Sequence, residues 1–560
     1  MADRLLGAQV LARMLHGYGV SHVFYVPCLA VRALAELEDL GVRRVVTHSE
    51  KAAAYMADGF ARASGRPGVC FSQHIGASNL ASGLRDAFMG GSPVIAICGG
   101  PEPSTRFRHG YQDVEDVSQF DAVTKSSSFV DTVDRLPDLL RQAFRAATTG
   151  GPGPVHLGLR GRIGIVVEDE IETDILVEPR FARVPPFRPV ADAACVDEAL
   201  AVLRQAQRPI LVAGGGVVSS GAEAEVLALA ERLGIPMATS LNAKHVIPDG
   251  HPLAVGVCGS YSRSCANKAV AEADVVFFVG SRTGGMVTFN WQIPRKGATV
   301  LQLDIDPAEL GRNYPNRVSL AGDAQATLRL MLERLPDPAP IAARLAPWRE
   351  RTAALVAAWR AENDAVRRSD AIPMRPERLC LELSDVLPPD AVLVSDTGHA
   401  GIWTGTMVEL RHPGQRYIRC AGSMGWGLPG AIGVKFALPD RPVVCFTGDG
   451  ALYYHLPELE TAVRHGVKLI VVVNDNAALS QEMPGVVRAY GNQLRGRGAE
   501  MFAFEKTDFA QVARSLGCVG LRATTPAEFR DAFRTALAAD RCVVIDAVTD
   551  LQAMAQKPWS

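Results

Sequence analysis

The chain has 560 residues, of which 48% are hydrophobic and 21% charged, with 58 basic against 60 acidic side chains. At about 150 residues per domain, this length predicts three or four domains, each with its own core. The balanced charge gives no reason to expect a nucleic-acid partner, and the hydrophobic content excludes a disordered chain.

The apolar runs are far shorter than the roughly 18 residues of a membrane-spanning helix, so we expect no membrane span. Eleven cysteines, none spaced Cys-x-x-Cys, argue against a zinc site or a disulfide framework. The N-terminus lacks the pattern of a signal peptide. These features predict a cytoplasmic protein.

Short β-branched runs alternate with Ala/Leu-rich helical stretches, which predicts α/β domains with parallel sheets covered by helices on both faces. The predicted strands are Val23–Val26, Val94–Cys98, Pro154–Leu159, Pro209–Val212, Val275–Gly280, Val300–Ile305, Val392–Ser395, Val443–Thr447 and Leu469–Val473. Proline-rich linkers at Val184–Val190 and Leu335–Pro340 separate them into groups. We therefore predict three doubly wound domains over residues 1–183, 190–335 and 370–560.

The most specific motif lies in residues 441–480. A strand (Pro442–Thr447) leads into the turn Gly448-Asp449-Gly450, a helix over Leu456–His465 follows, and a second strand (Lys468–Val473) ends in Asn474-Asp475-Asn476. In a right-handed βαβ unit both strands point the same way, so Asp449 and Asn476 emerge together at the carboxyl edge. A carboxylate, an amide oxygen and a backbone carbonyl suit Mg²⁺, and the glycines let a diphosphate approach the backbone.

This run resembles the signature of the thiamine-diphosphate-dependent enzymes, in which Gly-Asp-Gly is followed by an Asn or Asp-Asn pair. The resemblance implies that Gly448, Asp449, Gly450, Ala451 and Asn476 bind thiamine diphosphate. It also implies that Asp449, Asn476 and the backbone of Ala478 bind Mg²⁺. The alternative is an ordinary glycine turn beside a polar strand end. On the same resemblance the three domains are a pyrimidine-binding, a central nucleotide-binding-like and a diphosphate-binding domain.

Glu50 follows a predicted strand over Val42–Thr47 and precedes an Ala-rich helix over Lys51–Ala63. This arrangement resembles the family's short strand that ends in the catalytic glutamate. The resemblance implies that Glu50 protonates the aminopyrimidine N1′ of the cofactor, so that the 4′-nitrogen removes the proton at C2. The alternative is a carboxylate favoured by the dipole of the helix it begins.

Two segments of the C-terminal domain resemble cofactor-binding segments of the family. Ser423-Met424-Gly-Trp-Gly-Leu-Pro is similar to Met-Gly-Phe-Gly-Leu-Pro, which implies cofactor contacts from Ser423 and from Met424, the residue that props the cofactor in its bent shape. A core methionine is the alternative. Asp396-Thr-Gly398-His399 is similar to the diphosphate-holding Asp-x-Gly-Gln-His, with His399 in place of Gln. Because His399 replaces the family's Gln, the resemblance assigns a diphosphate contact more firmly to the backbone of Gly398 than to the side chain of His399.

Three residues of the N-terminal domain complete the expected site. Tyr111-Gln112-Asp113 is similar to a Phe-Gln-Glu segment whose Gln faces the thiazolium, and Gly76-Ala-Ser-Asn79 is similar to Gly-Ala-Thr-Asn. Hydrogen bonds within loops are the alternative for both Gln112 and Asn79. His74 stands near the place of the family's Gly-Pro, where it is either a proton relay facing the substrate or a structural histidine.

The central domain has polar and glycine residues where its predicted strands end. These positions resemble the places where relatives hold FAD, or ADP in the acyl-CoA-lyase branch, and Asp304 is placed to bind a ribose hydroxyl. The residues are Gly214, Gly215, Gly280, Arg282, Asp304 and Asp323. Because Arg282-Thr-Gly-Gly replaces the family's Arg-Phe-Asp-Asp, an empty central domain stays open beside FAD and ADP.

The resemblance covers nearly the whole chain and is closest to the acetolactate-synthase-like branch, large catalytic subunit. It implies a carboligase that decarboxylates a 2-oxo acid and joins the remainder to a second carbonyl, in a homodimer or homotetramer with active sites at the subunit interface. The alternatives are a 2-oxo acid decarboxylase, a 2-hydroxyacyl-CoA lyase, a flavin-dependent 2-oxo acid oxidase and a non-catalytic nucleotide-binding protein. The segment after Asn476 lacks the Met-Val-x-Gln-Trp pattern of biosynthetic acetolactate synthases, which leaves the physiological substrates open.

Overall fold

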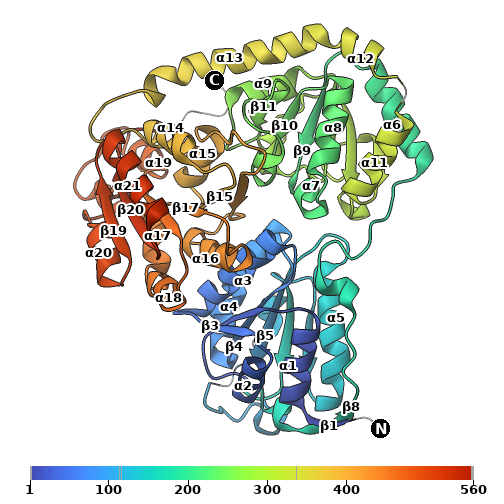
Figure 1. Ribbon diagram of the computed structural model, residues 1–560, viewed down its shortest axis with the longest axis vertical. Coiled ribbons are helices and arrows are strands. Elements are labelled where there is room, and N and C mark those ends of the chain that lie inside the picture. The colour runs from blue at the N-terminus through green and yellow to red at the C-terminus, as the bar shows by residue number, and fades with distance from the viewer. Residues whose placement is uncertain (1–2, 113, 115–116, 336, 556–560) are drawn as a thin grey trace.

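The computed structural model describes residues 3–112, 114, 117–335 and 337–555. Its helices and strands form three α/β units, each built on a six-stranded sheet whose strands are all parallel (Figure 1). This arrangement confirms the predicted fold class of three doubly wound domains. The boundaries at residues 183, 190, 335 and 370 stay predictions.

The N-terminal unit lies at the bottom of Figure 1, and its sheet has the strand order β3-β2-β4-β5-β7-β6. Its strands are β2 (His22–Tyr25), β3 (Arg43–Val46), β4 (Gly68–Ser72), β5 (Val94–Gly99), β6 (Ser127–Val130) and β7 (Val155–Leu159), with an antiparallel pair of β1 (Asp3–Leu6) and β8 (Glu170–Thr173) beside them. Its helices are α1 (Gly7–Gly17), α2 (Val31–Asp39), α3 (Glu50–Ser64), α4 (Ala77–Gly90) and α5 (Leu136–Thr148).

The central unit has the strand order β11-β10-β9-β12-β13-β14, so the order reverses between β9 and β12. Its strands are β9 (Pro209–Ala213), β10 (Met237–Thr239), β11 (Ala254–Val257), β12 (Val275–Val279), β13 (Thr299–Asp304) and β14 (Asn316–Ala321). Its helices are α6 (Ala193–Gln205), α7 (Gly215–Ser220), α8 (Glu223–Leu233), α9 (Ser264–Glu272), α10 (Gly285–Thr288), α11 (Ala324–Arg334) and α12 (Ala339–Arg344).

The long helix α13 (Ala346–Arg367) crosses the top of Figure 1 from the central to the C-terminal unit, whose sheet has the order β16-β15-β17-β18-β20-β19. The strands are β15 (Val392–Ser395), β16 (Arg416–Arg419), β17 (Val443–Gly448), β18 (Ile470–Asp475), β19 (Val519–Ala523) and β20 (Val543–Val548). The helices are α14 (Pro376–Val386), α15 (His399–Thr406), α16 (Gly427–Ala437), α17 (Asp449–Leu452), α18 (Glu458–Arg464), α19 (Met483–Ala489), α20 (Phe509–Ser515) and α21 (Pro526–Ala538).

The predicted helix over Leu456–His465 corresponds to α18 (Glu458–Arg464), with bounds that agree within two residues. The chain turns helical at Asp449 itself, continues as a 3₁₀ turn over Tyr453–His455, and begins α18 only after Pro457. Proline has no backbone N–H to donate to the preceding turn, so a continuous helix is interrupted there. The second strand, β18, in turn extends through Asn474 and Asp475.

Helices α3 and α16 join the N-terminal and C-terminal units through direct backbone contact. A Cβ atom added at Gly59 would lie 2.1 Å from the carbonyl oxygen of Gly430, and one added at Gly433 would lie 2.0 Å from that of Met56. Only glycine permits so close an approach. Around this crossing, buried side chains of both units form one hydrophobic core.

The central unit joins the C-terminal unit through a buried ionic cluster. Asp249 pairs with Lys244 and Arg263, and Arg263 donates to the backbone carbonyl of Thr406. No helix in the part of the chain that the structure describes combines the length and apolar character needed to span a bilayer.

Candidate active site

The predicted metal pair lies at the carboxyl edge of the C-terminal sheet, where the order of the strands reverses. Strand β17 lies between β15 and β18, and Gly448 at its end is in register with Asn474 of β18. The loops that follow these three strands therefore meet at one crevice, the usual ligand position in an open parallel sheet.

The Asp449 carboxylate joins two of these loops. It accepts hydrogen bonds from the backbone N–H groups of Gly450 (2.6 Å), Asn476 (3.1 Å) and Ala478 (3.1 Å). Burial, followed by the nearby charge of Asp475, raises the pKa of Asp449 to about 7. The structure thus brings Asp449, Asn476 and Ala478 together as the sequence predicted.

The oxygen atoms at this point suit a hard cation. The Asn476 side-chain oxygen is buried without a hydrogen-bond partner, and the Ala478 carbonyl accepts no hydrogen bond within the described residues. No group of three His, Cys, Asp or Glu side chains among the described residues could bind a metal ion. A cation here would therefore rely on the carboxylate, the amide and the carbonyl, which is a donor set for Mg²⁺.

The Gly448-Asp449-Gly450 turn lies at this crevice. A Cβ atom at Gly448 would meet nothing within 4 Å, whereas one at Gly450 would lie 2.6 Å from Leu479, and Ala451 is buried. Gly448 is therefore open to a ligand, while Gly450 is required by packing.

The loop after β15 also contacts the Asn476 side. Gly398 has a φ of +65° at the start of α15, a conformation that favours glycine. His399 shares a 2.7 Å hydrogen bond with the Ser480 hydroxyl, and the Asn476 amide donates to the same hydroxyl at 3.1 Å. Burial lowers the pKa of His399 to about 4, so its imidazole is neutral at pH 7. Its contribution to a diphosphate would be a hydrogen bond rather than a charge.

The loop that contains Ser423 and Met424 is held by two buried carboxylates. Asp86, on α4 of the N-terminal unit, accepts hydrogen bonds from the backbone N–H groups of Ala421, Gly422 and Ser423 at 2.7–3.0 Å. Asp396, at the end of β15, accepts those of Gly425 and Gly427 at 3.1 and 2.7 Å. Met424 is half-buried between these two anchors.

Arg62 and Asp58 support the Asp86 anchor from α3. The Arg62 guanidinium donates to both oxygens of Asp58 and to Asp86 at 2.7–2.9 Å, and Trp426 donates to Asp58 at 2.9 Å. Asp58 and Asp86 are fully buried. Sequence reasoning missed Asp58, Arg62 and Asp86, because each lies in an ordinary helical pattern that gives no sign of a partner several hundred residues away.

We expect Asp86→Asn to lower the free energy of unfolding by roughly 2–5 kcal/mol and to weaken thiamine diphosphate binding. An amide retains one acceptor oxygen, but its NH₂ group faces N–H donors and no longer balances Arg62. Urea denaturation and cofactor titration of the variant measure the two effects. Asp134→Asn, at an exposed aspartate of the same unit, is the matched control. Unchanged cofactor affinity in the Asp86 variant would show that the anchor is not needed for the site.

Glu50 is the first residue of α3, which Ser49 caps by accepting the N–H of Ala52 at 3.1 Å. The Asn79 amide donates to Glu50 at 3.2 Å, so two predicted site residues are in contact. A Cβ atom at Gly76 would lie 2.3 Å from the Glu50 carboxylate. Gly76 therefore leaves room for a carboxylate that Asn79 holds in one direction.

Gln112 and His74 lie in adjoining segments of the N-terminal unit. Gln112 has a φ of +62°, which is uncommon for a residue other than glycine and marks a tight turn. His74 is buried, and its Nε2 lies 2.9 Å from the carbonyl oxygen of Val114. This contact is that of a structural histidine that holds the Gln112 loop, so a proton-relay role for His74 stays a prediction without support from its geometry. Asp113 lies outside the described residues.

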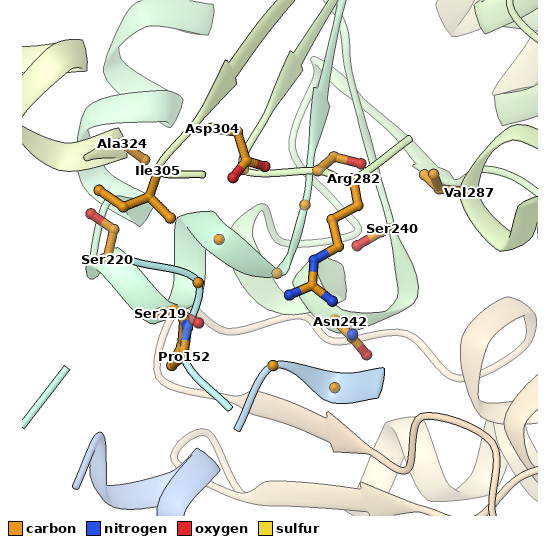
Figure 2. A pocket seen from close by; sticks show the side chains of 18 of the residues that line it. Pro152, Ser219, Ser220, Ser240, Asn242, Arg282, Val287, Asp304, Ile305 and Ala324 are labelled. Atoms are coloured by element: carbon orange, nitrogen blue, oxygen red, sulfur yellow. The ribbon is translucent and has the colours of Figure 1, made fainter. Parts of the chain in front are cut away.

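The six residues predicted to bind a second nucleotide all line one cavity of about 270 Å³. The cavity is formed by the carboxyl ends of β9, β12 and β13, with the N-terminal unit as its floor (Figure 2). Arg282 points into it, opposite Ser219 and Asn242, and Asp304 lies at its upper wall. Burial raises the pKa of Asp304 to about 6.

Several of these six residues have structural duties in the cavity wall. A Cβ atom at Gly214 would lie 2.1 Å from the carbonyl oxygen of Gly280, so these two glycines allow β9 and β12 to converge. Asp323 caps α11 and accepts hydrogen bonds from Ser220 and Arg188 at 2.7 and 2.9 Å. Gly215 and Arg282 are therefore better placed than the others to touch a ligand through exposed atoms, whereas Asp304 is buried and accepts a 3.0 Å hydrogen bond from the N–H of Asp306.

Family models match three stretches of the chain, described as the N-terminal TPP binding domain (residues 6–120), the central domain (196–331) and the C-terminal TPP binding domain (396–547) of thiamine pyrophosphate enzymes. A probable acetolactate synthase large subunit of Methanocaldococcus jannaschii is 32% identical over 97% of this chain and 92% of its own length. Acetolactate synthase isozyme 3 large subunit of Escherichia coli is 29% identical over 98% and 95%, and an acetolactate synthase of Arthrospira platensis is 31% identical over 92% and 89%.

Proposed function

This chain belongs to the thiamine pyrophosphate enzyme family, and we propose that it works there as an acetolactate-synthase-like carboligase acting on 2-oxo acids. The near full-length similarity to acetolactate synthases favours this reaction over the decarboxylase, lyase and oxidase alternatives. The single observation that most supports the thiamine diphosphate site on which this reaction depends is the Asp449 carboxylate, which joins the Gly-Asp-Gly turn to Asn476 and Ala478.

Thiamine diphosphate (thiamine pyrophosphate) supplies a thiazolium carbon that adds to a 2-oxo acid and accepts the electrons released with carbon dioxide. We assign to Glu50 the proton that tunes the aminopyrimidine, and to Asn79 the orientation of that carboxyl. Gly448 and the neutral His399 would bind the diphosphate. Asp86 and Asp396 hold the loop from which Met424 would support the cofactor.

Mg²⁺ would be bound by the Asp449 carboxylate, the Asn476 amide oxygen and the Ala478 carbonyl. The unpartnered Asn476 oxygen supports this assignment, because a divalent cation would satisfy it. The diphosphate of the cofactor would complete the coordination.

We propose a homodimer or homotetramer in which Glu50 of one subunit faces Asp449 of another. Exposed apolar side chains near Glu50 and near the Gly-Asp-Gly turn support a subunit interface at both places. Ile75 is 47% exposed near Glu50, and Tyr454 and Phe504 are 54% and 38% exposed near the Gly-Asp-Gly turn. Burial of these side chains against another subunit would remove apolar surface from water.

We propose that the central cavity binds FAD or ADP. The unpartnered, buried hydroxyl of Ser240 and the Arg282 side chain support a polar, anionic ligand, and Asp304 suits a ribose hydroxyl. The absorbance spectrum of the purified protein and mass spectrometry of released small molecules distinguish the two nucleotides. Release of neither would support the alternative of an empty domain.

Incubation of the purified protein with pyruvate, thiamine diphosphate and Mg²⁺ tests the proposed reaction. We expect acetolactate, measured as acetoin after treatment with acid, in excess over acetaldehyde. Acetaldehyde as the main product would instead indicate a decarboxylase. Oxygen consumption with added FAD would indicate an oxidase, and cleavage of a 2-hydroxyacyl-CoA would indicate a lyase.

A further inference from the structure

Arg419 is the last residue of β16 and projects between the domains. It lines the central cavity and also a neighbouring cavity of about 340 Å³, which residues of all three units enclose. Only 5% of its surface is exposed. Its own carbonyl oxygen accepts a 2.7 Å hydrogen bond from Arg62, so its backbone is tied to the Asp86 anchor.

The Arg419 guanidinium has no ion-pair or hydrogen-bond partner among the residues that the structure describes. Its Nε atom is buried and unpaired, and the Tyr261 ring centre lies 6.0 Å from its Cζ atom, at the limit of a cation–π contact. The other buried arginines that the structure describes are paired, Arg263 with Asp249 and Arg367 with Glu409. A buried charge without a partner is unfavourable, which points to an anion that arrives with a ligand.

The surroundings of Arg419 favour a phosphate as that anion. Arg282 enters the central cavity from the end of β12, and Ser219, Ser240 and Asn242 line the same space (Figure 2). The Ser240 hydroxyl is likewise buried without a partner. Two guanidinium groups with hydroxyl and amide donors form a set that binds phosphate oxygens.

We propose that Arg419 is an anion-binding residue of the central cavity and pairs with a phosphate group of the nucleotide bound there. The proposal rests on the proposed occupancy of that cavity by FAD or ADP. It assigns a phosphate contact to the C-terminal unit, although the sequence placed every nucleotide contact in the central one. Since Arg419 directly precedes the segment over 420–424, a bound nucleotide would also fix the strand that leads to Met424.

Isothermal titration calorimetry tests the proposal. It measures the affinity of the wild type, Arg419→Gln and Arg419→Lys for ADP, FAD, riboflavin and inorganic pyrophosphate. The control is Arg329→Gln, which removes an exposed arginine paired with Glu225. We expect Arg419→Gln to lose roughly tenfold to a hundredfold in affinity for ADP or FAD, with Arg419→Lys intermediate and riboflavin binding unchanged.

A thermal melt of the ligand-free variants separates anion binding from a structural role. Because the Gln variant removes an unpaired buried charge, it should melt no lower than the wild type. Equal nucleotide affinity in both proteins, or a lower melting temperature of the ligand-free variant, would overturn the proposal. Pyrophosphate binding that depends on Arg419, without ADP or FAD binding, would support the anion site and refute the nucleotide; no binding of any probe would overturn both.

Discussion

Replacing Glu50 by Gln is expected to reduce turnover by roughly 10²- to 10⁴-fold, the range that a positioned acid or base contributes. The variant keeps the size of the side chain and its place at the start of α3. It loses the ability to exchange a proton with the aminopyrimidine. Steady-state turnover with pyruvate, together with the rate of hydrogen–deuterium exchange at C2 of the bound cofactor, measures the effect.

Thiamine diphosphate binding is measured in the same samples. A slow C2 exchange rate with the cofactor still bound indicates loss of proton transfer, whereas weak binding indicates loss of the cofactor. Glu36→Gln is the matched control, because Glu36, like Glu50, is a half-buried helical glutamate of the same unit. Turnover and C2 exchange at the wild-type rate in the Glu50 variant would refute its assignment as the catalytic acid.

Replacing Asp449 by Asn is expected to weaken Mg²⁺-dependent binding of thiamine diphosphate by at least about 10- to 100-fold, since loss of a second-shell partner alone costs that much in other metal sites. The substitution preserves shape but removes the charge that a divalent cation requires. Asn476→Ala should act in the same direction, because it removes the unpartnered amide oxygen. Titration with cofactor at several Mg²⁺ concentrations measures both.

Two features of this experiment keep it interpretable. Asp440→Asn, at an exposed aspartate of the same unit, controls for the loss of one negative charge. The Asp449 carboxylate also holds the loop over 476–478, so the substitution could disturb the fold. The circular dichroism spectrum shows whether the variant keeps its secondary structure. A folded Asp449 variant with undiminished Mg²⁺ dependence would exclude this carboxylate as a ligand.

The contacts between Asp449 and Asn476 were predictable because neighbouring parallel strands end at a common edge. The same rule brought Gly214, Gly280 and Asp304 to one cavity. These groupings need only the strands and their order. The assignment of each side chain to a ligand stays a prediction, as it does for Gln112, Asn79 and Ser423.

Contacts between distant elements could not be predicted in this way. Nothing local to Asp86 indicates that it accepts three backbone hydrogen bonds from the loop before α16, and nothing local to Arg419 indicates a missing partner. For His74, sequence reasoning could not choose between a buried structural role and an exposed catalytic one, since burial depends on packing against the segment near Val114.

The glycine crossing of α3 and α16 has a consequence for recombining this enzyme with its relatives. Backbone meets backbone at Gly59, Gly430 and Gly433, so a methyl group on either helix would force the pair apart. A chimera that takes its first third from one parent and its last third from another would keep this crossing only if both parents have glycine at these positions. The two outer domains are thus better exchanged as a matched set, with the middle domain as the replaceable module.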